Sequence, residues 1–310
     1  MSNAVIKLPP GRLSAIKDAY RSNEVPPKAP SVTFTAKLPD VTVTAYNSGK
    51  VLFQGAGAAR EAARWGETQP AKTASGAKGD ALPEGFAARS VLGSDETGTG
   101  DFFGPITVAA CYVPSDKIAL AEELGAKDSK QLTDAAMRTI APDLKAAFAH
   151  SVLTLPTEKY NDVQAKGWSQ GKIKALLHNQ ALRHTLRKLG DERPDAILID
   201  QFAERGVYYR HLKDEADIVR DGVLFSTKAE GLHVSVACAS IIARVAFLEA
   251  MDELSAKAGV ALPKGAGSGV DEAAAKILLK KGPEFLKSIT KAHFANTKKA
   301  EVLAKRKIKE

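Results

Sequence analysis

The chain has 310 residues, of which 44% are hydrophobic and 26% are charged, as is ordinary for a soluble globular protein. This length is sufficient for a core domain and a smaller companion domain. Lys and Arg (44) outnumber Asp and Glu (36), so the formal net charge is +8, which suits a protein that holds a polyanion on its surface.

The two cysteines and the N-terminal residues argue against several classes of protein. Cys111 and Cys238 lie in apolar stretches, which favours buried free thiols over a disulfide or a metal site. The first residues lack the apolar core of a secretory leader, and no run approaches the roughly 18 apolar residues of a membrane span. We therefore expect a cytoplasmic protein with no membrane association, and nothing demands more than a monomer.

Residues 1–66 predict a small α+β domain. Apolar residues at helical spacing predict helices over 10–22 and 58–65. Between them the period changes to two over 32–38, 41–46 and 50–55, which predicts a three-stranded meander. Such a sheet has a polar face that is either solvated or able to grip a sugar–phosphate backbone without reading bases. This face carries Thr33, Thr35, Thr42 and Thr44, with Lys37 and Lys50 nearby.

The segment that follows, 67–88, contains many small residues and shows no apolar period. This composition predicts a flexible linker. A second and larger domain is then expected over 89–310.

The most informative stretch of the chain is 94–105, Ser-Asp-Glu-Thr-Gly-Thr-Gly-Asp-Phe-Phe-Gly-Pro. It joins two apolar runs and predicts a strand, a tight glycine loop and a second strand. The adjacent carboxylates Asp95 and Glu96 suggest a divalent cation, because Mg²⁺ takes oxygen ligands and needs several charges to bind well. Gly98 and Gly100 let the main chain approach a polar ligand closely. The alternative is a structural hairpin with a solvated acidic turn.

The glycine spacing argues against a nucleotide-binding loop. Gly98, Gly100 and Gly104 give G-x-G-x-x-x-G, which is one residue longer than the dinucleotide fingerprint. The next segment, 105–113, predicts a strand rather than the helix that such a loop requires. The sequence contains no Walker-type G-x-x-x-x-G-K-[ST] motif either.

The ungapped stretch 95–105 resembles the signature of the type 2 ribonucleases H, and most of all that of the bacterial ribonuclease HIII branch. The resemblance implies an α/β fold, with a ribonuclease H-like core of mixed sheet and flanking helices. A small α+β domain similar to the TATA-box-binding protein would precede this core and hold the substrate, an RNA/DNA hybrid. The catalytic domain would then be 89–310 and the substrate-binding domain 1–66.

Two further carboxylates fit the resemblance. Residues 196–200 predict a buried strand that ends at Asp200, and active groups of open α/β sheets collect at the carboxyl ends of strands. Alone, Asp200 could equally be a structural acid, but the family has Asp-Gln-Phe after this strand. Glu230 occupies the Lys-x-acid position that the family has before a helix with the pattern Ala-Ser-Ile-Ile-Ala-Arg. Many relatives have Asp there, and Asp221 is the runner-up for the fourth acid.

The helical segments of the second domain carry three further polar residues of interest. In the family, the segment with Ser129 and Lys130 lies near the active site and the substrate, so the resemblance implies that both residues contact substrate. Spacing alone indicates only a helix start there, capped by Thr133. His178 lies on a long amphipathic helix over 173–189, and we assign it to packing or to the surface rather than to catalysis.

The resemblance implies metal-assisted hydrolysis of the RNA strand. Four carboxylates would hold two Mg²⁺ or Mn²⁺ ions in an in-line displacement that leaves 5′-phosphate and 3′-hydroxyl ends. Main-chain groups of the glycine loop would bond to the 2′-hydroxyl, which distinguishes RNA from DNA. The four ligands are Asp95, Glu96, Asp200 and Glu230, and the loop residues are Gly98, Thr99 and Gly100.

Two alternatives remain open. One is incision at single ribonucleotides in DNA, as in the ribonuclease HII branch, although that branch usually has a basic residue where this chain has Thr99. The other is a hybrid-binding protein without catalysis, for which the complete set of acids is a poor fit.

Overall fold

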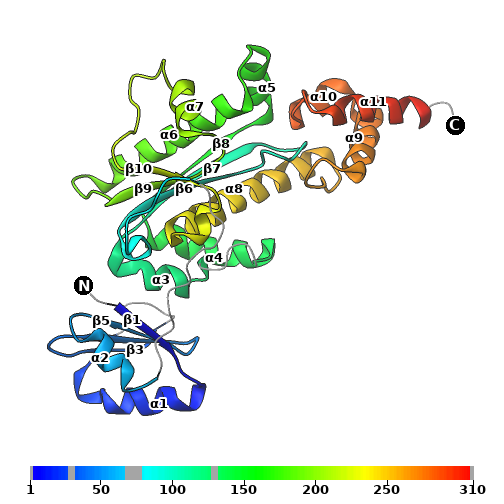
Figure 1. The fold of residues 1–310 in the computed structure, drawn as a ribbon. Coiled ribbons are helices and arrows are strands. Elements are labelled where there is room, and N and C mark those ends of the chain that lie inside the picture. Colours follow the sequence, from blue (N-terminus) through cyan, green and yellow to red (C-terminus); the bar gives the residue numbers. More distant parts are fainter. Residues whose placement is uncertain (1–2, 27–31, 67–78, 127–131, 308–310) are drawn as a thin grey trace. The chain divides into compact units, whose positions relative to one another are not determined.

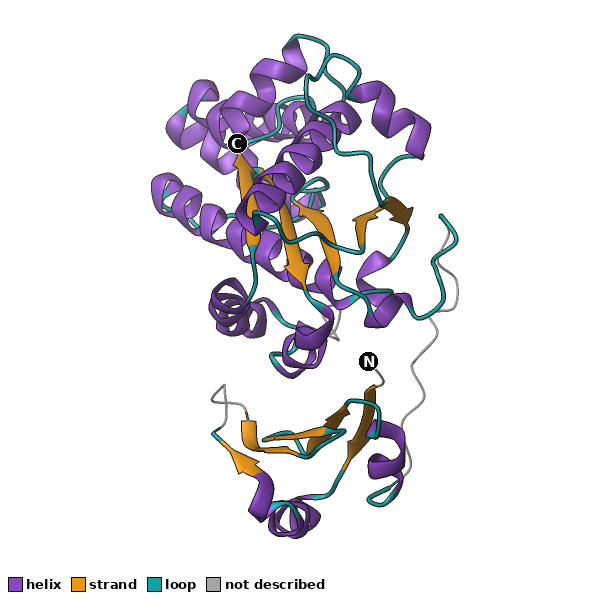
Figure 2. Ribbon diagram, turned by 90° about the vertical axis from the view of Figure 1, so that its left-hand side faces the viewer, coloured by secondary structure: helices purple, strands orange, loops and turns teal. Residues whose placement is uncertain are grey.

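The computed structural model describes residues 3–26, 32–66, 79–126 and 132–307. The chain divides into two compact units, a small one formed mainly by residues 1–75 and a larger one formed by most of the remainder. Figures 1 and 2 show the elements of each unit.

The small unit is a five-stranded antiparallel sheet with two helices on one face. Its sheet order is β1-β5-β4-β3-β2. The helices bury their apolar side against this sheet, where Ile16, Phe34 and Phe53 are fully or almost fully buried. In chain order its elements are β1 (Asn3–Lys7), α1 (Pro10–Ala19), β2 (Glu24–Val25), β3 (Val32–Lys37), β4 (Thr42–Tyr46), β5 (Lys50–Gln54) and α2 (Ala58–Ala63).

The predicted meander is confirmed as β3, β4 and β5, but two strands were missed. Strand β1 pairs antiparallel with β5, with Val5 opposite Leu52, and the two-residue β2 pairs with β3. A pairing between strands that lie so far apart in the chain leaves no local signal, and two residues are too few to show a period of two.

The polar side chains of the meander lie on one face, as the alternation predicts. Thr35 is opposite Thr44, and Lys37 is opposite Thr42. All four side chains keep part of their surface in solvent, whereas Phe34, Ala36 and Val43 between them are buried. Lys50 lies on the same face, because Leu52 and Gln54 of its strand are opposite Thr44 and Thr42.

The large unit is built around a mixed five-stranded sheet with the order β10-β9-β6-β7-β8. Strands β10, β9 and β6 run parallel, whereas β6, β7 and β8 run antiparallel. The mixed sheet with flanking helices confirms the predicted core. The strands are β6 (Val91–Thr97), β7 (Ile106–Val113), β8 (His150–Leu155), β9 (Ala196–Asp200) and β10 (Val223–Ser226).

Helices cover both faces of this sheet (Figure 1). Leu92, Ile197 and Ile199 pack on the side of α6, whereas Val91 and Leu198 pack on the side of α8. Gly93 lets α8 approach β6, because a Cβ atom there would lie 2.4 Å from the amide nitrogen of Val236. The helices are α3 (Ile118–Glu123), α4 (Asp134–Ala147), α5 (Thr157–Ala165), α6 (Gln170–Leu189), α7 (Arg205–His211), α8 (Val234–Ala258), α9 (Ser268–Lys281), α10 (Pro283–Ile289) and α11 (Ala295–Lys307).

Part of the predicted linker belongs to the large unit. Residues 67–78 lie outside the described residues, but 79–88 pack on the core sheet. The amide of Asp80 donates to the carbonyl of Phe225 at 2.8 Å, and the carboxylate of Asp80 accepts from the Phe225 amide at 2.7 Å. Phe86 is buried beside Val91 and Leu198. The small-residue composition hid this packing, because its anchors are one aspartate and one phenylalanine.

Helix α8 is long and apolar enough to cross a membrane by length and composition alone. Most of it is buried in the core, however, where it packs against β6 and β7. This burial identifies α8 as the central helix of the large unit. Cys111 of β7 and Cys238 of α8 are both buried and free, as predicted.

Candidate active site

Parallel pairing brings Asp95 and Asp200 together at one end of the core sheet. Ser94 of β6 pairs with Ile199 of β9, so the next residue of each strand, Asp95 and Asp200, lies at the same level. Both carboxylates line a cleft of about 420 Å³, together with Glu230. This is the convergence that the sequence predicted for three of the four acids.

The structure distinguishes Glu230 from Asp221 as the acid that reaches this cleft. Strand β10 runs parallel to β9, with Ser226 opposite Asp200. Glu230 follows the carboxyl end of β10 in a short 3₁₀ turn, Ala229–Gly231. Asp221 precedes the other end of the strand and lines a separate hollow beside Ala196.

The turn that carries Glu230 is fixed to Asp200. The amide of Ala229 donates to Oδ1 of Asp200 at 2.8 Å. Lys228, immediately before it, has a φ of 57° and is the one non-glycine residue with positive φ in the described part of the chain. Such a conformation is strained for a side chain with a Cβ atom. The strained residue therefore directly precedes the amide that bonds to Asp200, and it also lines the cleft.

The carboxylates in the cleft repel one another. Burial raises the pKa of Asp95 to about 8, and the charges of Asp200 and Glu96 add to the shift. Burial also raises the pKa of Asp200, with further contributions from Glu230 and Glu96. The raised pKa values mean that the charged forms of these carboxylates are disfavoured in the cleft. A bound cation would offset the repulsion and stabilise the charged forms.

Glu96 differs from the other acids because a lysine and a histidine side chain already contact its carboxylate. The Nζ atom of Lys174 donates to Oε1 at 2.7 Å, and Nε2 of His178 lies 2.8 Å from Oε2. Burial alone raises the pKa of Glu96, but the hydrogen bonds and charges of His178 and Lys174 outweigh it and lower this pKa. The other ring nitrogen of His178 lies 2.7 Å from Oγ of Ser94.

The assignment of His178 to packing or to the surface was therefore incomplete. The side chain is fully buried, but it contacts one of the predicted ligands. Lys174 and His178 are four residues apart on α6, so they lie on the same face of the helix. A lysine and a histidine on the apolar side of an amphipathic helix were the sequence signal for this contact.

The acids have the chemistry of a divalent-metal site. In the described part of the chain, no three His, Cys, Asp or Glu side chains already form a compact metal-binding cluster. The mutual repulsion of Asp95, Asp200 and Glu96 nevertheless favours a divalent cation, and carboxylate oxygens are the ligands that Mg²⁺ and Mn²⁺ prefer. The residues present thus fit such ions.

The glycine loop adjoins the end of β6, and its glycines have different roles. Gly98 has a φ of 94°, and a Cβ atom there would lie 2.2 Å from the carbonyl oxygen of Pro105. Gly98 is buried, so the absence of a Cβ atom at this position is required by packing within the loop. Gly100 is exposed with open space around it, as approach to a ligand requires. The carbonyl of Thr99 between them accepts from Nε2 of Gln170 at 3.0 Å.

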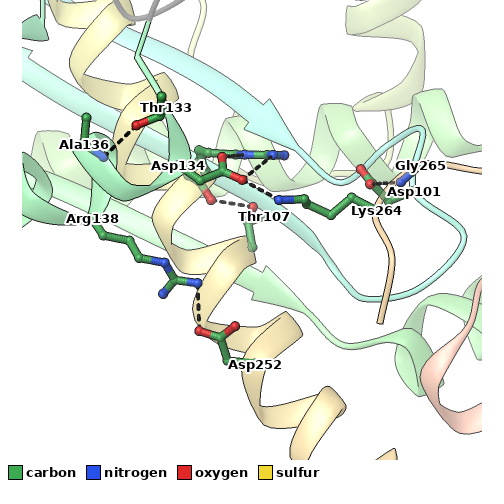
Figure 3. Close-up of polar contacts among 11 residues, drawn as sticks. Asp101, Thr107, Thr133, Asp134, Ala136, Arg138, Asp252, Lys264 and Gly265 are labelled. Atoms are coloured by element: carbon green, nitrogen blue, oxygen red, sulfur yellow. Dashed lines mark hydrogen bonds and ion pairs between the residues drawn. The ribbon is translucent and has the colours of Figure 1, made fainter. Parts of the chain in front are cut away.

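A network of charged residues borders the cleft (Figure 3). Asp134, at the start of α4, accepts from Nε of Arg244 at 2.9 Å and from Nζ of Lys264 at 2.5 Å. The hydrogen bond from Arg244 is the main cause of the lowered pKa of Asp134. Asp134 and Arg244 both line the cleft, and sequence reasoning assigned neither to the site.

Two predicted substrate contacts, Ser129 and Lys130, lie outside the described residues. The predicted helix cap that follows them is confirmed, since the hydroxyl of Thr133 accepts from the amide of Ala136 at 3.2 Å.

Comparisons with known proteins cover both units. A family model described as Ribonuclease HII matches residues 92–297, and a domain of unknown function matches 3–78. Ribonuclease HIII of Lysinibacillus sphaericus is 61% identical over 97% of this chain and 99% of its own. Ribonuclease HIII of Bacillus subtilis is 53% identical over 99% of each chain. The solved structure of Bst-RNase HIII in complex with Mn²⁺ is 46% identical, with a TM-score of 0.70 over 98% of this chain and 100% of its own.

Proposed function

This chain belongs to the ribonuclease HII family, and from that premise we propose that it is a metal-dependent endonuclease that hydrolyses the RNA strand of RNA/DNA hybrids. The observation that carries the proposal is the meeting of Asp95, Asp200 and Glu230 in one cleft. These acids come from three different strands or turns, and only the fold brings them together. No serine or histidine nucleophile is required by this chemistry.

In this proposal Asp95, Glu96, Asp200 and Glu230 hold two divalent ions, Mg²⁺ or Mn²⁺. Such ions, when bound, activate water and stabilise the leaving 3′ oxygen, so that 5′-phosphate and 3′-hydroxyl ends result. The chain's own part is to hold its carboxylates in place. The Ala229 amide fixes Asp200, and Lys174 with His178 fixes Glu96.

Selectivity for RNA is proposed to come from the main chain of Gly98, Thr99 and Gly100. The open space around Gly100 allows close approach of a ribose, and the 2′-hydroxyl is both a donor and an acceptor for peptide groups. Gln170 supports this role, because it holds the Thr99 carbonyl in a fixed direction.

Further contacts to the hybrid are proposed on both units. The polar face of the small unit, with Thr35, Thr42, Thr44 and Lys37, has the hydroxyls and charge that contact a sugar–phosphate backbone. Ser129 and Lys130 are also proposed to contact the substrate. We also propose that the protein acts as a monomer in the cytoplasm.

The test of the function uses Asp95→Asn with two substrates, a continuous RNA/DNA hybrid and a DNA duplex with one embedded ribonucleotide. Wild type should cleave the continuous hybrid in Mg²⁺ or Mn²⁺ and lose activity in EDTA, and D95N should bind this hybrid without cleaving it. Cleavage of only the single-ribonucleotide duplex would favour the ribonuclease HII-like alternative. Hybrid binding by a wild type that never cleaves would favour the non-catalytic alternative.

A further inference from the structure

The ammonium group of Lys291 is buried in the large unit, and the hydrogen bonds that it makes within the described residues all go to main-chain carbonyls. Its side chain is 0% exposed, and it follows the end of α10. The Nζ atom donates to the carbonyls of Gly104 at 2.6 Å, Asp101 at 2.7 Å and Pro105 at 3.4 Å. All three acceptors lie in the loop between β6 and β7, which also carries Gly98, Thr99 and Gly100.

A second set of contacts joins the same half of the loop to the segment around Lys291. The amide of Gly104 donates to the carbonyl of Ile289 at 3.1 Å, and the amide of Lys291 donates to the carbonyl of Phe102 at 2.9 Å. Phe103 and Thr290 form an isolated antiparallel bridge. Residues 102–104 thus pair with residues 289–291 as two short antiparallel strands do. The side chain of Lys291 bonds to the same half of the loop.

The remaining side of the loop is tied to the segment between α8 and α9 (Figure 3). The amide of Gly265 donates to Oδ1 of Asp101 at 2.6 Å, and the amide of Phe102 donates to the carbonyl of Gly265 at 2.9 Å. Every described residue from Asp101 to Pro105 except Phe103 is therefore held by a hydrogen bond from these two segments or from Lys291. The exposed half of the loop, with Gly100, continues directly from this anchored half.

A buried lysine is an unusual choice for a purely structural contact. Burial lowers the pKa of Lys291 to about 7, although the charge of Asp101 opposes the shift. Three carbonyls that converge on one point repel one another, and each would be left without a donor beside an apolar side chain. An ammonium group offers three donors from one atom, so it satisfies all three acceptors at once.

We propose that Lys291 is a positioning residue for RNA recognition. Its ammonium fixes the Asp101–Pro105 half of the loop, and this sets where the main chain of Thr99 and Gly100 meets the ribose. The inference rests on the proposed function, in which the loop recognises the 2′-hydroxyl. It assigns to a residue near the C-terminus, outside the acidic cleft, a part in the choice between RNA and DNA.

The experiment compares Lys291→Met with the matched control Lys287→Met, an exposed lysine on the neighbouring helix α10. Binding of an RNA/DNA hybrid and of a DNA duplex of the same sequence is measured in Ca²⁺ by fluorescence anisotropy. The ratio of the affinity for the hybrid to the affinity for the DNA duplex should be about tenfold lower in K291M than in wild type. A change of this size corresponds to the loss of one or two hydrogen bonds. The affinity of K291M for the DNA duplex and the preference of K287M should stay unchanged.

A wild-type preference in folded K291M would overturn the inference, and so would an equal loss of affinity for both duplexes. Should K291M fail to fold by circular dichroism, Lys291→Arg keeps the charge but alters the donor geometry, and it should retain part of the preference. Full wild-type preference in K291R together with unfolding of K291M would also overturn the inference. A wild type without any preference would instead contradict the proposed function itself.

Discussion

The Nζ atom of Lys174 lies 2.7 Å from Oε1 of Glu96, and both side chains are largely buried. Removal of one partner from a buried ion pair leaves the other charge uncompensated. We therefore expect Lys174→Met to lower the free energy of unfolding by about 3 kcal/mol. We also expect it to lower kcat about tenfold or more, on the scale of a displaced metal ligand. Urea unfolding and steady-state cleavage of a hybrid measure the two effects.

The control for this prediction is Lys172→Met, on the same helix. The ammonium of Lys172 lies over the ring of Trp168 and contacts no acid of the cleft. Its loss should change stability by well under 1 kcal/mol and leave kcat unchanged, as for most surface substitutions. Equal effects of K172M and K174M would show that the contact with Glu96 is not the cause.

Asp221 precedes β10 and Glu230 follows it, so the two acids lie near opposite ends of this strand. This difference gives a second prediction. Glu230→Gln removes a carboxylate from the cleft and should lower kcat by about a hundredfold or more, given that a catalytic metal supplies several kcal/mol. Asp221→Asn, at the opposite end of the strand, should leave kcat within about twofold of wild type. Cleavage assays at saturating Mn²⁺ compare the two variants. Loss of activity in D221N with activity retained in E230Q would reverse the assignment of the fourth acid.

The raised pKa of Asp95 predicts a pH-dependent stability. The pKa of Asp95 in the native state is about 8, against 3.8 for an aspartate that is exposed to water, as in the unfolded chain. Between these two pH values the native state therefore binds more protons than the unfolded state. Stability of the metal-free protein should therefore fall as the pH rises through this range. Asp95→Asn removes the effect, so D95N should be more stable than wild type by about 2 kcal/mol near pH 8, which allows for partial solvation.

Urea unfolding in EDTA at several pH values measures this difference, which should shrink as the pH approaches about 4. Mg²⁺ or Mn²⁺ should stabilise wild type more than D95N, because a ligand that binds only the native state adds to its stability. Parallel stability curves for the two proteins between about pH 4 and pH 8 would contradict the prediction.

The sequence was informative wherever one short stretch contained the whole signal. The stretch 94–105 predicted strand, loop and strand, and the buried run 196–200 placed Asp200 at a strand end, as the structure has both. Contacts between distant segments were not predictable in this way. Lys174 meets Glu96 because of how α6 crosses β6, and Lys291 meets Asp101 from the far end of the chain. No local period encodes a crossing angle or a long-range contact.

The glycine loop illustrates the same limit within a single motif. The pattern located Gly98 and Gly100 correctly but gave both the same role. The structure separates them, because Gly98 packs against Pro105 and Phe247 whereas Gly100 is open to solvent. Which side of a loop faces the core depends on the segments that cover it, here α8 and the residues around Lys291.

The ion pairs between α4 and α8 supply the last prediction (Figure 3). Asp134 accepts two hydrogen bonds from Arg244, and its pKa is lowered mainly by them. A carboxyl with a lowered native pKa stabilises the fold above its unfolded pKa, and this contribution is lost as the pH falls. Asp134→Asn should therefore lower the free energy of unfolding by about 1 kcal/mol near pH 7, since the pair is partly solvated, and by less near pH 4.

Arg138 and Asp252 join the same two helices through an ion pair of 2.7 Å, with Asp252 68% exposed. Asp252→Asn is thus a matched control, expected to change stability by less than about 0.5 kcal/mol. Urea unfolding of both variants at about pH 7 and pH 4 separates the two pairs. A loss in D252N as large as that in D134N would mean that any charge between α4 and α8 suffices. A larger loss in D134N that shrinks toward pH 4 would show that the pairing of Asp134 with Arg244 and Lys264 at the cleft stabilises the fold more than the exposed pair does.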